Sequence, residues 1–347
     1  MKYDFTSILN RRGKDAIAVD APYSEDCFNH DYFAGVTLKE GMDWIPMWVA
    51  DMDFQTAPCI INALKKRVEH GIFGYTRVPE EYYDAVISWF SRRHHWKPRR
   101  EWFIYTSGVV PALSAVIKAL TNVGDKVLTL TPVYNCFFSS IRNNGCELDS
   151  CALRYEDNTF SIDYEDLERR AADPKTTLML LCNPHNPSGR VWTREELRRI
   201  GDICIRNNVV VVADEIHCEL VHPGFTYTPF ASVSEEFQKH SVTCVAPSKA
   251  FNIAGLQIAN IIVENEEWRQ RIDKAININE VCDVNPFGVI ATIAAYNEGE
   301  EWLNQLLQYI HGNYLLFKDY CEEHLPLLPV APLEGTYLAW MDCRSLN

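Results

Sequence analysis

The stretch "TLMLLCNPHNPSGRVWTREELRRIGDICIRNNVVVVADEIH", residues 177–217, contains a strand-like run, a helical pattern and a second strand-like run. Its apolar runs at 177–182 and 208–213 are continuous, which is typical of strands that are buried on both faces. Between them, Thr193 and Glu196 have the spacing of a capping box, so we expect a helix to begin there. This succession predicts two parallel strands that a helix connects and covers.

The same alternation extends over much of the chain. Strand-like runs occur at 103–105, 126–130 and 241–245, and helical patterns follow the first two at 111–120 and 135–144. Such alternation is typical of proteins in which helices cover both faces of a sheet. We therefore expect an α/β fold with a doubly wound, mostly parallel sheet.

Both ends of the chain depart from this pattern. Residues 1–54 are irregular, and residues 286–347 contain two helical patterns before the strand-like run "GTYLAWMDC" at 335–343. We expect residues 55–285 to form a large domain, whose first helix ends at Gly71. Both chain ends are expected to form a smaller α/β domain that packs on it.

Composition argues against several classes of protein. The 347 residues are 47% hydrophobic and 23% charged, as in an ordinary globular chain with a large core. The net charge of -14 argues against a nucleic-acid or anionic-membrane partner. The longest apolar runs are strand-sized, so no membrane span is expected. Twelve scattered cysteines form no Cys-x-x-Cys pair, and no signal peptide precedes them, which favours a reduced cytoplasmic protein.

The ten histidines raise the question of a metal site. His94 and His95 have basic neighbours, which predicts an exposed basic helix end. His217 and His222 lack the spacing of zinc motifs. We therefore expect no metal site.

Unusual residues follow five of the predicted strands. In an open α/β sheet, ligands bind outside the carboxyl ends of the strands, so we expect these segments to line one crevice. The segments are Ser107-Gly108-Val109-Val110, Thr131-Pro132-Val133-Tyr134, 183–189, Asp214-Glu215-Ile216-His217 and Ala246-Pro247-Ser248-Lys249.

Each segment allows a structural and a ligand-binding interpretation. The turn at Ser107 caps a helix, or it offers backbone N–H groups and a positive helix end to a phosphate. Asp214 caps a helix, or it holds a protonated nitrogen of a ligand. The two Asn-Pro pairs of 183–187 form a tight turn, or they make a rigid segment that fixes an asparagine side chain. A cis peptide bond is compatible with such a segment. Tyr134 belongs to the core or stacks on an aromatic ligand.

Lys249 lies in "VAPSKAFNIAGLQIANIIV", residues 245–263, which contains no acidic residue. It is a solvated surface lysine at a strand end, or it is a desolvated nucleophile with a lowered pKa. A reactive lysine, a phosphate cradle, a stacking ring, an asparagine and a buried carboxylate are the groups that pyridoxal phosphate requires. Their co-occurrence favours the nucleophile.

Three segments resemble those of the fold-type I pyridoxal-phosphate enzymes, the class I/II aminotransferase superfamily. They are "CNPHNPSGRVW" (182–192), "VVADEIHCEL" (211–220) and "APSKAFNIAGLQ" (246–257). The resemblance covers nearly the whole chain and implies an aspartate-aminotransferase-like fold with pyridoxal 5'-phosphate as cofactor. The segments "PMWVADMDF" (46–54) and "FGYTRVPEEYYDAV" (73–86) resemble the cystathionine β-lyase-like C–S lyase branch.

The resemblance implies roles for the residues of the predicted crevice. Lys249 is the expected Schiff-base lysine, and Asp214 is the expected partner of the pyridine nitrogen. Tyr134 is expected to stack on the cofactor ring. Asn186 is the expected donor to the phenolic oxygen, and His217 is expected near that oxygen.

The resemblance also implies how the phosphate is held and how the subunits assemble. Val109, Val110 and Ser248 are expected to cradle the phosphate. Tyr75 is expected to reach the phosphate of a neighbouring subunit, which implies a homodimer with shared active sites. The segment 48–54 is expected to line the substrate entrance.

Two departures from the family pattern concern affinity. Gln257 and Ala246 stand where many members have an arginine and a serine that grip the phosphate, which implies a lighter grip. The family's arginine for the substrate α-carboxylate lies beyond 335–343, whereas this chain stops at Asn347 and Arg344 is too close to that run to match it. We therefore expect a truncated small domain and poor substrate affinity.

The implied activity is α,β-elimination from cystathionine or a cysteine-type thioether, which gives pyruvate, ammonia and a thiol. In this reaction Lys249 removes the Cα proton, and Asp214 keeps the pyridine nitrogen protonated. Two alternatives stay open. One is an aminotransferase of the same superfamily, and the other is a pyridoxal-phosphate-binding regulatory protein with weak activity.

Overall fold

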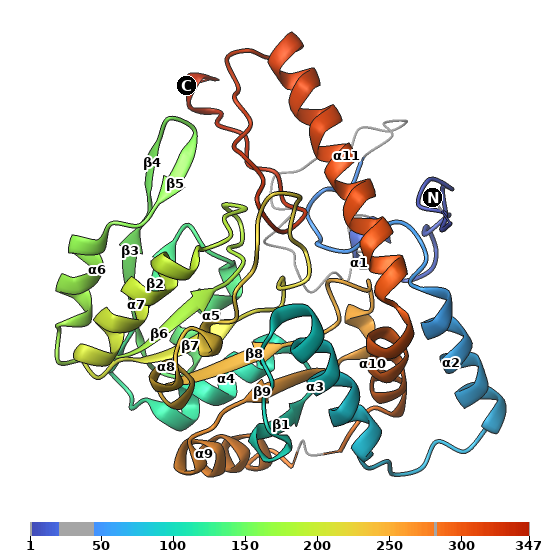
Figure 1. Ribbon diagram of the computed structural model, residues 1–347, viewed down its shortest axis with the longest axis horizontal. Coiled ribbons are helices and arrows are strands. Elements are labelled where there is room, and N and C mark those ends of the chain that lie inside the picture. Colours follow the sequence, from blue (N-terminus) through green and yellow to red (C-terminus); the bar gives the residue numbers. More distant parts are fainter. Residues whose placement is uncertain (1, 21–44, 281–282, 347) are drawn as a thin grey trace.

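A seven-stranded sheet with the strand order β1-β9-β8-β7-β6-β2-β3 forms the centre of the molecule (Figure 1). This computed structural model describes residues 2–20, 45–280 and 283–346. The strands of the sheet are β1 (Phe103–Thr106), β2 (Lys126–Thr131), β3 (Glu147–Ala152), β6 (Thr176–Cys182), β7 (Val210–Asp214), β8 (Ser241–Val245) and β9 (Ala259–Ile262). A separate hairpin consists of β4 (Arg154–Glu156) and β5 (Thr159–Ser161).

The sheet is mixed but mostly parallel. Strands β3, β2, β6, β7 and β8 pair in parallel, whereas β9 is antiparallel to both β8 and β1. Strand β1 consequently runs in the same direction as the parallel strands. The carboxyl ends of six strands therefore meet at one edge of the sheet, and the predicted α/β, mostly parallel fold is confirmed.

Helices cover both faces of the sheet. The described α-helices are α1 (Ile17–Asp20), α2 (Pro58–His70), α3 (Glu80–His94), α4 (Val109–Leu120), α5 (Asn135–Asn143), α6 (Tyr164–Ala171), α7 (Arg194–Arg206), α8 (Glu235–Lys239), α9 (Glu266–Asn277), α10 (Pro286–Glu298) and α11 (Glu300–His324). Leu178 and Leu180 of β6 pack in one apolar cluster with α4, α5 and α9. Met179 and Leu181 pack in another with α6, α7 and α8. Burial on both faces explains why this strand reads as a continuous apolar run.

Two helix boundaries agree with the sequence signals. The Thr193 hydroxyl accepts from the backbone N–H of Glu196 at 3.2 Å, and the Glu196 carboxylate accepts from the N–H of Thr193 at 2.8 Å. Helix α2 ends at Gly71, which has a φ of 73°. Glycine adopts this left-handed conformation without steric cost.

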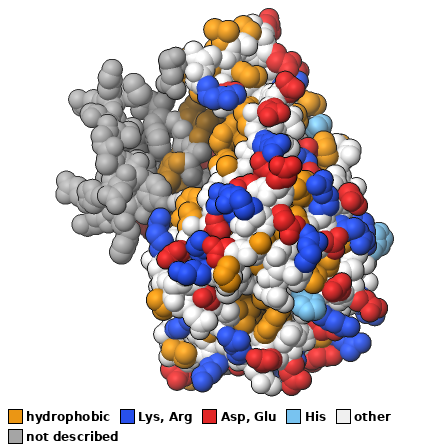
Figure 2. Space-filling view, turned by 90° about the vertical axis from the view of Figure 1, so that its left-hand side faces the viewer, with side chains coloured by type: hydrophobic (Ala, Val, Ile, Leu, Met, Phe, Trp, Pro, Cys, Tyr) orange, Lys and Arg blue, Asp and Glu red, His pale blue; other side chains and the backbone are white. Residues whose placement is uncertain are grey.

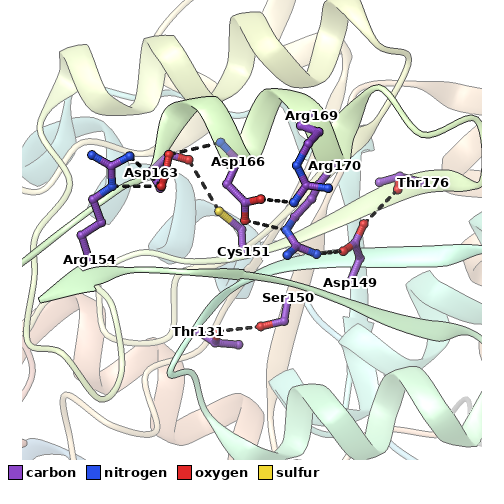
Figure 3. Close-up of polar contacts among 10 residues, drawn as sticks. All are labelled: Thr131, Asp149, Ser150, Cys151, Arg154, Asp163, Asp166, Arg169, Arg170 and Thr176. Atoms are coloured by element: carbon purple, nitrogen blue, oxygen red, sulfur yellow. Dashed lines mark hydrogen bonds and ion pairs between the residues drawn. The ribbon is translucent and has the colours of Figure 1, made fainter.

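Ion pairs fasten α6 over the edge strand β3 (Figure 3). The guanidinium of Arg170 bridges Asp166 of the same helix and Asp149 of β3. Asp149 is buried, and it also accepts from Thr176 Oγ1 at 3.4 Å. Asp163 caps α6 and pairs with Arg154 at 2.7 Å. An edge strand that carries charge and lies beneath a helix is protected from pairing with another chain.

The two ends of the chain pack on one another. Phe5 lies in an aromatic cluster with Phe54, Trp302 and Tyr309, and its ring stacks on Tyr309 at 5.5 Å. The backbone N–H of Lys2 donates to the side-chain oxygen of Gln305 in α11 at 2.6 Å. These contacts support our proposal that both ends form one smaller domain, with boundaries at residues 54 and 285.

The prediction of a strand in "GTYLAWMDC" is wrong. Among the described residues, this run makes only isolated bridges, between Gly335 and Val221 and between Met341 and Val330. The N–H of Gly335 donates instead to Gly189 O at 2.8 Å. Because such partners lie in turns rather than in a neighbouring strand, the run forms an irregular segment, whose first residues contact the loops after β6 and β7.

The prediction of an exposed basic helix end is wrong for His94, whose side chain is 9% exposed. Its Nε2 lies 2.6 Å from the buried carboxylate of Glu219, which also pairs with Arg93 at 3.0 Å and accepts from Trp89 Nε1 at 2.6 Å. His94, Glu219 and Cys218 are the one described group whose potential metal-ligand atoms lie within 4.8 Å of one another. Since the carboxylate already contacts Trp89, the cationic Arg93, His94 and Cys218, we interpret the group as a structural ion-pair cluster.

Acidic and basic side chains are interspersed over the face shown in Figure 2. In the part of the chain that the structure describes, no helix combines the length and apolarity needed to span a bilayer.

Candidate active site

A cavity of about 620 Å³ opens at the carboxyl ends of the strands. All five segments that the sequence singled out contribute to its wall, so their predicted convergence is confirmed. The lining residues include Ser107, Val109, Val110, Val133, Tyr134, Asn186, Asp214, His217, Ser248 and Lys249. They converge because parallel strands deliver their following loops to the same edge of a sheet.

Lys249 follows β8 and lies in the cavity wall rather than on an outer surface. Its Nζ donates to the backbone carbonyl of Ala50 at 2.8 Å. Burial lowers the pKa of Lys249, although Asp51 and Asp214 oppose this shift. A lysine with a lowered pKa is more often an unprotonated amine at neutral pH and can act as nucleophile or base.

Asp214 ends β7 and is 4% exposed. Its Oδ1 accepts from the backbone N–H of Ile216 at 3.2 Å. Burial raises the pKa of Asp214 to about 7, while the hydrogen bond from Ile216 and the charge of Lys249 lower it. A protonated ring nitrogen would give this carboxylate the cationic partner that a buried charge requires.

His217 is 2% exposed and stays neutral, because burial lowers its pKa to about 3. Within the described part of the chain, its Nδ1 has no hydrogen-bond partner. A buried polar atom without a partner is costly, so a ligand atom in the cavity would stabilise it. Asn186 reaches the same cavity from the turn 183–189, in which the peptide bonds before Pro184 and Pro187 are cis.

The N-terminus of α4 faces the cavity through Val109 and Val110. Gly108 is its N-cap, and no described side chain caps it, so the cap interpretation of Ser107 is wrong. Open N–H groups at a helix N-terminus bind anions such as phosphate, and Ser248 adds a hydroxyl on the same wall.

Tyr134, Tyr75 and Gln257 differ in their position relative to the cavity. Tyr134 is 36% exposed and lines the cavity, as a stacking residue would. Tyr75 is 97% exposed and lies outside the described cavity wall, so its role toward a neighbouring subunit stays a prediction. Gln257 also lies outside that wall. From the entrance segment, Trp48 and Ala50 line the cavity.

Sequence reasoning missed the contribution of the C-terminal segment. Leu338 lines the cavity, and the hydroxyl of Tyr337 donates to the carbonyl of Ala50 at 2.9 Å. The available signal was "GTYLAWMDC", which we interpreted only as a strand. Its side chains reach the site because the segment is irregular.

These residues fit pyridoxal phosphate. The unpartnered Nδ1 of His217, the buried carboxylate of Asp214 and the open helix N-terminus of α4 are complementary to its oxygen, ring nitrogen and phosphate. The fold and the site together define a fold-type I pyridoxal-phosphate-dependent enzyme.

Comparison with known proteins supports this class. Residues 43–347 match the model of the family "Aminotransferase class I and II", and the chain belongs to this family. Cystathionine beta-lyase PatB of Bacillus subtilis (strain 168) is 44% identical over 300 residues, which cover 86% of this chain and 78% of that protein.

Two solved structures have a similar fold. The PLP-bound putative aminotransferase from Clostridium difficile 630 has a TM-score of 0.92 and 41% identity, over 99% of this chain and 86% of that chain. Cystalysin from Treponema denticola, which contains pyridoxal 5'-phosphate, has a TM-score of 0.92 and 36% identity, over 100% of this chain and 85% of that chain.

Proposed function

We propose that this protein is a pyridoxal-phosphate-dependent C–S β-lyase. It cleaves cystathionine or cysteine-type thioethers by α,β-elimination to pyruvate, ammonia and a thiol. The observation that carries the proposal is the position of Lys249 and Asp214 on the wall of one cavity, in a chain 44% identical to a cystathionine beta-lyase. Bound pyridoxal phosphate would supply an electron sink for the charge that forms at Cα of the substrate.

The residues of the chain supply the proton transfers. The amine of Lys249, whose pKa is lowered by burial, accepts the Cα proton as general base. The resulting ammonium then returns a proton to the sulfur as the Cβ–S bond breaks and the sulfur takes the electron pair. Asp214 holds the proton on the ring nitrogen of the cofactor, which strengthens the electron sink.

Other residues of the cavity hold the cofactor. Asn186 and His217 would bond its phenolic oxygen, and Tyr134 would stack on its ring. The N–H groups of Val109 and Val110, together with the Ser248 hydroxyl, would hold the phosphate. We expect this grip to be lighter than in family members with an arginine at the position of Gln257.

The proposed enzyme is a homodimer with shared active sites. Support comes from the exposed apolar segment beside Tyr75, in which Ile72 is 65% and Phe73 is 55% exposed. In a dimer, Tyr75 would reach the phosphate of the neighbouring subunit. We further propose a cytoplasmic location, which suits the free thiols of ten described cysteines.

The products of two incubations test the proposed reaction. One contains the holoenzyme with cystathionine and no keto acid, and the other contains an amino acid with 2-oxoglutarate. A C–S lyase releases thiol and pyruvate in the first incubation. Amino transfer in the second incubation without thiol release in the first would contradict the proposal and favour the aminotransferase alternative.

A further inference from the structure

Two side-chain donors from distant parts of the chain meet at one backbone oxygen. Lys249 Nζ donates to Ala50 O at 2.8 Å, and Tyr337 Oη donates to the same atom at 2.9 Å. A carbonyl oxygen has two lone pairs, so it can accept both bonds. The Ala50 carbonyl is thus a shared acceptor at the cavity wall.

The backbone that precedes Tyr337 in the chain is anchored by two hydrogen bonds. The N–H of Gly335 donates to Gly189 O at 2.8 Å, and the N–H of Thr336 donates to Leu220 O at 2.7 Å. The Tyr337 ring lies edge-on to His217, with ring centroids 6.0 Å apart. Burial raises the pKa of Tyr337, so its hydroxyl stays protonated and keeps the proton that it donates to Ala50 O.

Ala50 is also held from its other side. Arg11 pairs with Asp51 at 2.6 Å, next to Ala50 in the chain. Asn252, three residues after the lysine, accepts from Met52 N–H at 3.0 Å and donates to Met52 O at 2.9 Å. The acceptor and the lysine therefore belong to segments that are bonded to each other.

We propose that Tyr337 is a positioning residue that holds the Ala50 carbonyl as a docking point for the free amine of Lys249. The proposal rests on the proposed role of Lys249 as the base. The positive end of the Tyr337 hydroxyl dipole lies at the docking oxygen, which disfavours a full positive charge on the docked nitrogen. Tyr337 thereby keeps the docked lysine unprotonated and ready to accept a proton.

Removal of the Tyr337 hydroxyl tests this role in the cofactor-free protein. In Y337F the ring is retained, and both the lost dipole and easier water entry favour the ammonium form of Lys249. We expect the pH of half-maximal amine labelling of Lys249, followed by peptide mass spectrometry, to rise by about 0.5 units or more. At a fixed pH below that midpoint, labelling slows about threefold, because 0.5 units is a factor of about three.

A matched control separates positioning from general support. Tyr314 donates its hydroxyl to Ala331 O at 3.2 Å, and so it also fastens the C-terminal segment, but outside the cavity wall. Y314F should leave the labelling midpoint unchanged. In the holoenzyme, the limb of the kcat profile that reports the base in the substrate complex should move to higher pH for Y337F alone.

Circular dichroism checks that each variant is folded. A second variant at the same position keeps the proposal testable if Y337F fails to fold. Y337H retains a ring with an N–H donor, and its labelling midpoint should lie between those of the wild type and Y337F. Equal midpoints for wild type, Y337F and Y337H would overturn the proposal, as would equal shifts for Y337F and Y314F. Absence of thiol release by the wild type would instead contradict the proposed function, and would leave the labelling comparison unaffected.

Discussion

The side-chain amide of Asn183 donates to Oε1 of Glu215 at 3.0 Å, and both residues are buried. This bond connects the turn that carries Asn186 with the strand end that carries Asp214. Glu215 also accepts from the Tyr227 hydroxyl at 2.5 Å. One buried carboxylate thus holds two of the loops that form the cavity.

Substitution of Glu215 by leucine should destabilise the protein. Loss of the carboxylate leaves two buried donors, the backbone N–H of Phe230 and Tyr227 Oη, without their acceptor, at about 1–3 kcal/mol for each unsatisfied group. Urea unfolding of E215L should show a loss of at least about 2 kcal/mol. The exposed Glu236 provides the control, since E236L should change stability by less than about 0.5 kcal/mol. Equal stability of both variants would contradict this account.

Substitution of Lys249 by alanine should lower the rate of thiol release by at least about a hundredfold, as is usual when a general base is lost. Exposed Lys274 on α9 is the matched control, and K274A should keep the wild-type rate. Reduction of the holoenzyme with borohydride followed by peptide mapping should place the cofactor on Lys249. Label on another lysine would contradict the proposed role of Lys249.

Substitution of Asp214 by asparagine should change how the stability of the cofactor-free protein depends on pH. The pKa of Asp214 is about 7 in the folded protein, whereas an unfolded aspartate has a pKa of about 3.9. The folded state therefore binds more protons between these values, and its stability falls as the pH rises from about 4 to 7. Relative to D214N, the wild type should lose up to about 4 kcal/mol over this window.

Urea unfolding of both cofactor-free proteins at several pH values measures this difference. Other titrating groups are common to the two proteins, so the difference isolates Asp214. In the holoenzyme the same substitution should weaken elimination, because the ring nitrogen loses its anionic partner. Parallel stability curves for wild type and D214N would show that Asp214 does not titrate in this range.

Substitution of Asp149 by alanine tests the ion pairs that hold α6 over β3 (Figure 3). Arg170 would lose a partner that is 9% exposed, and we expect a loss of about 1–3 kcal/mol in the free energy of unfolding. Arg169, which is 68% exposed, makes a surface pair with Asp166. R169A should therefore cost less than about 1 kcal/mol. A larger loss for R169A than for D149A would contradict this assignment.

Much of the central sheet could be predicted because the apolar pattern of each buried strand is visible in a short stretch of sequence. Strands β6 and β7 are buried on both faces, so their residues are apolar without interruption, and the residues that follow parallel strands meet at one edge. Strand β3 was not predicted. It lies at the sheet edge and carries Glu147 and Asp149, so its sequence lacks a continuous apolar run.

The remaining errors concern partners that are distant in the sequence. His94 has basic neighbours in the chain, but its carboxylate partner, Glu219, is 125 residues away. Tyr337 belongs to an apolar run that resembles a strand, yet its contact with Ala50 and the contacts of the run with the turns of the large domain form only in the folded chain. Local pattern does not encode such pairings.

The most direct test of the central claim is the product balance of the wild-type holoenzyme with cystathionine as the sole substrate. We predict equal amounts of pyruvate, ammonia and thiol with no keto acid added, and loss of all three in K249A. The account would be contradicted if cystathionine were recovered intact, or if its amino group moved only to an added keto acid.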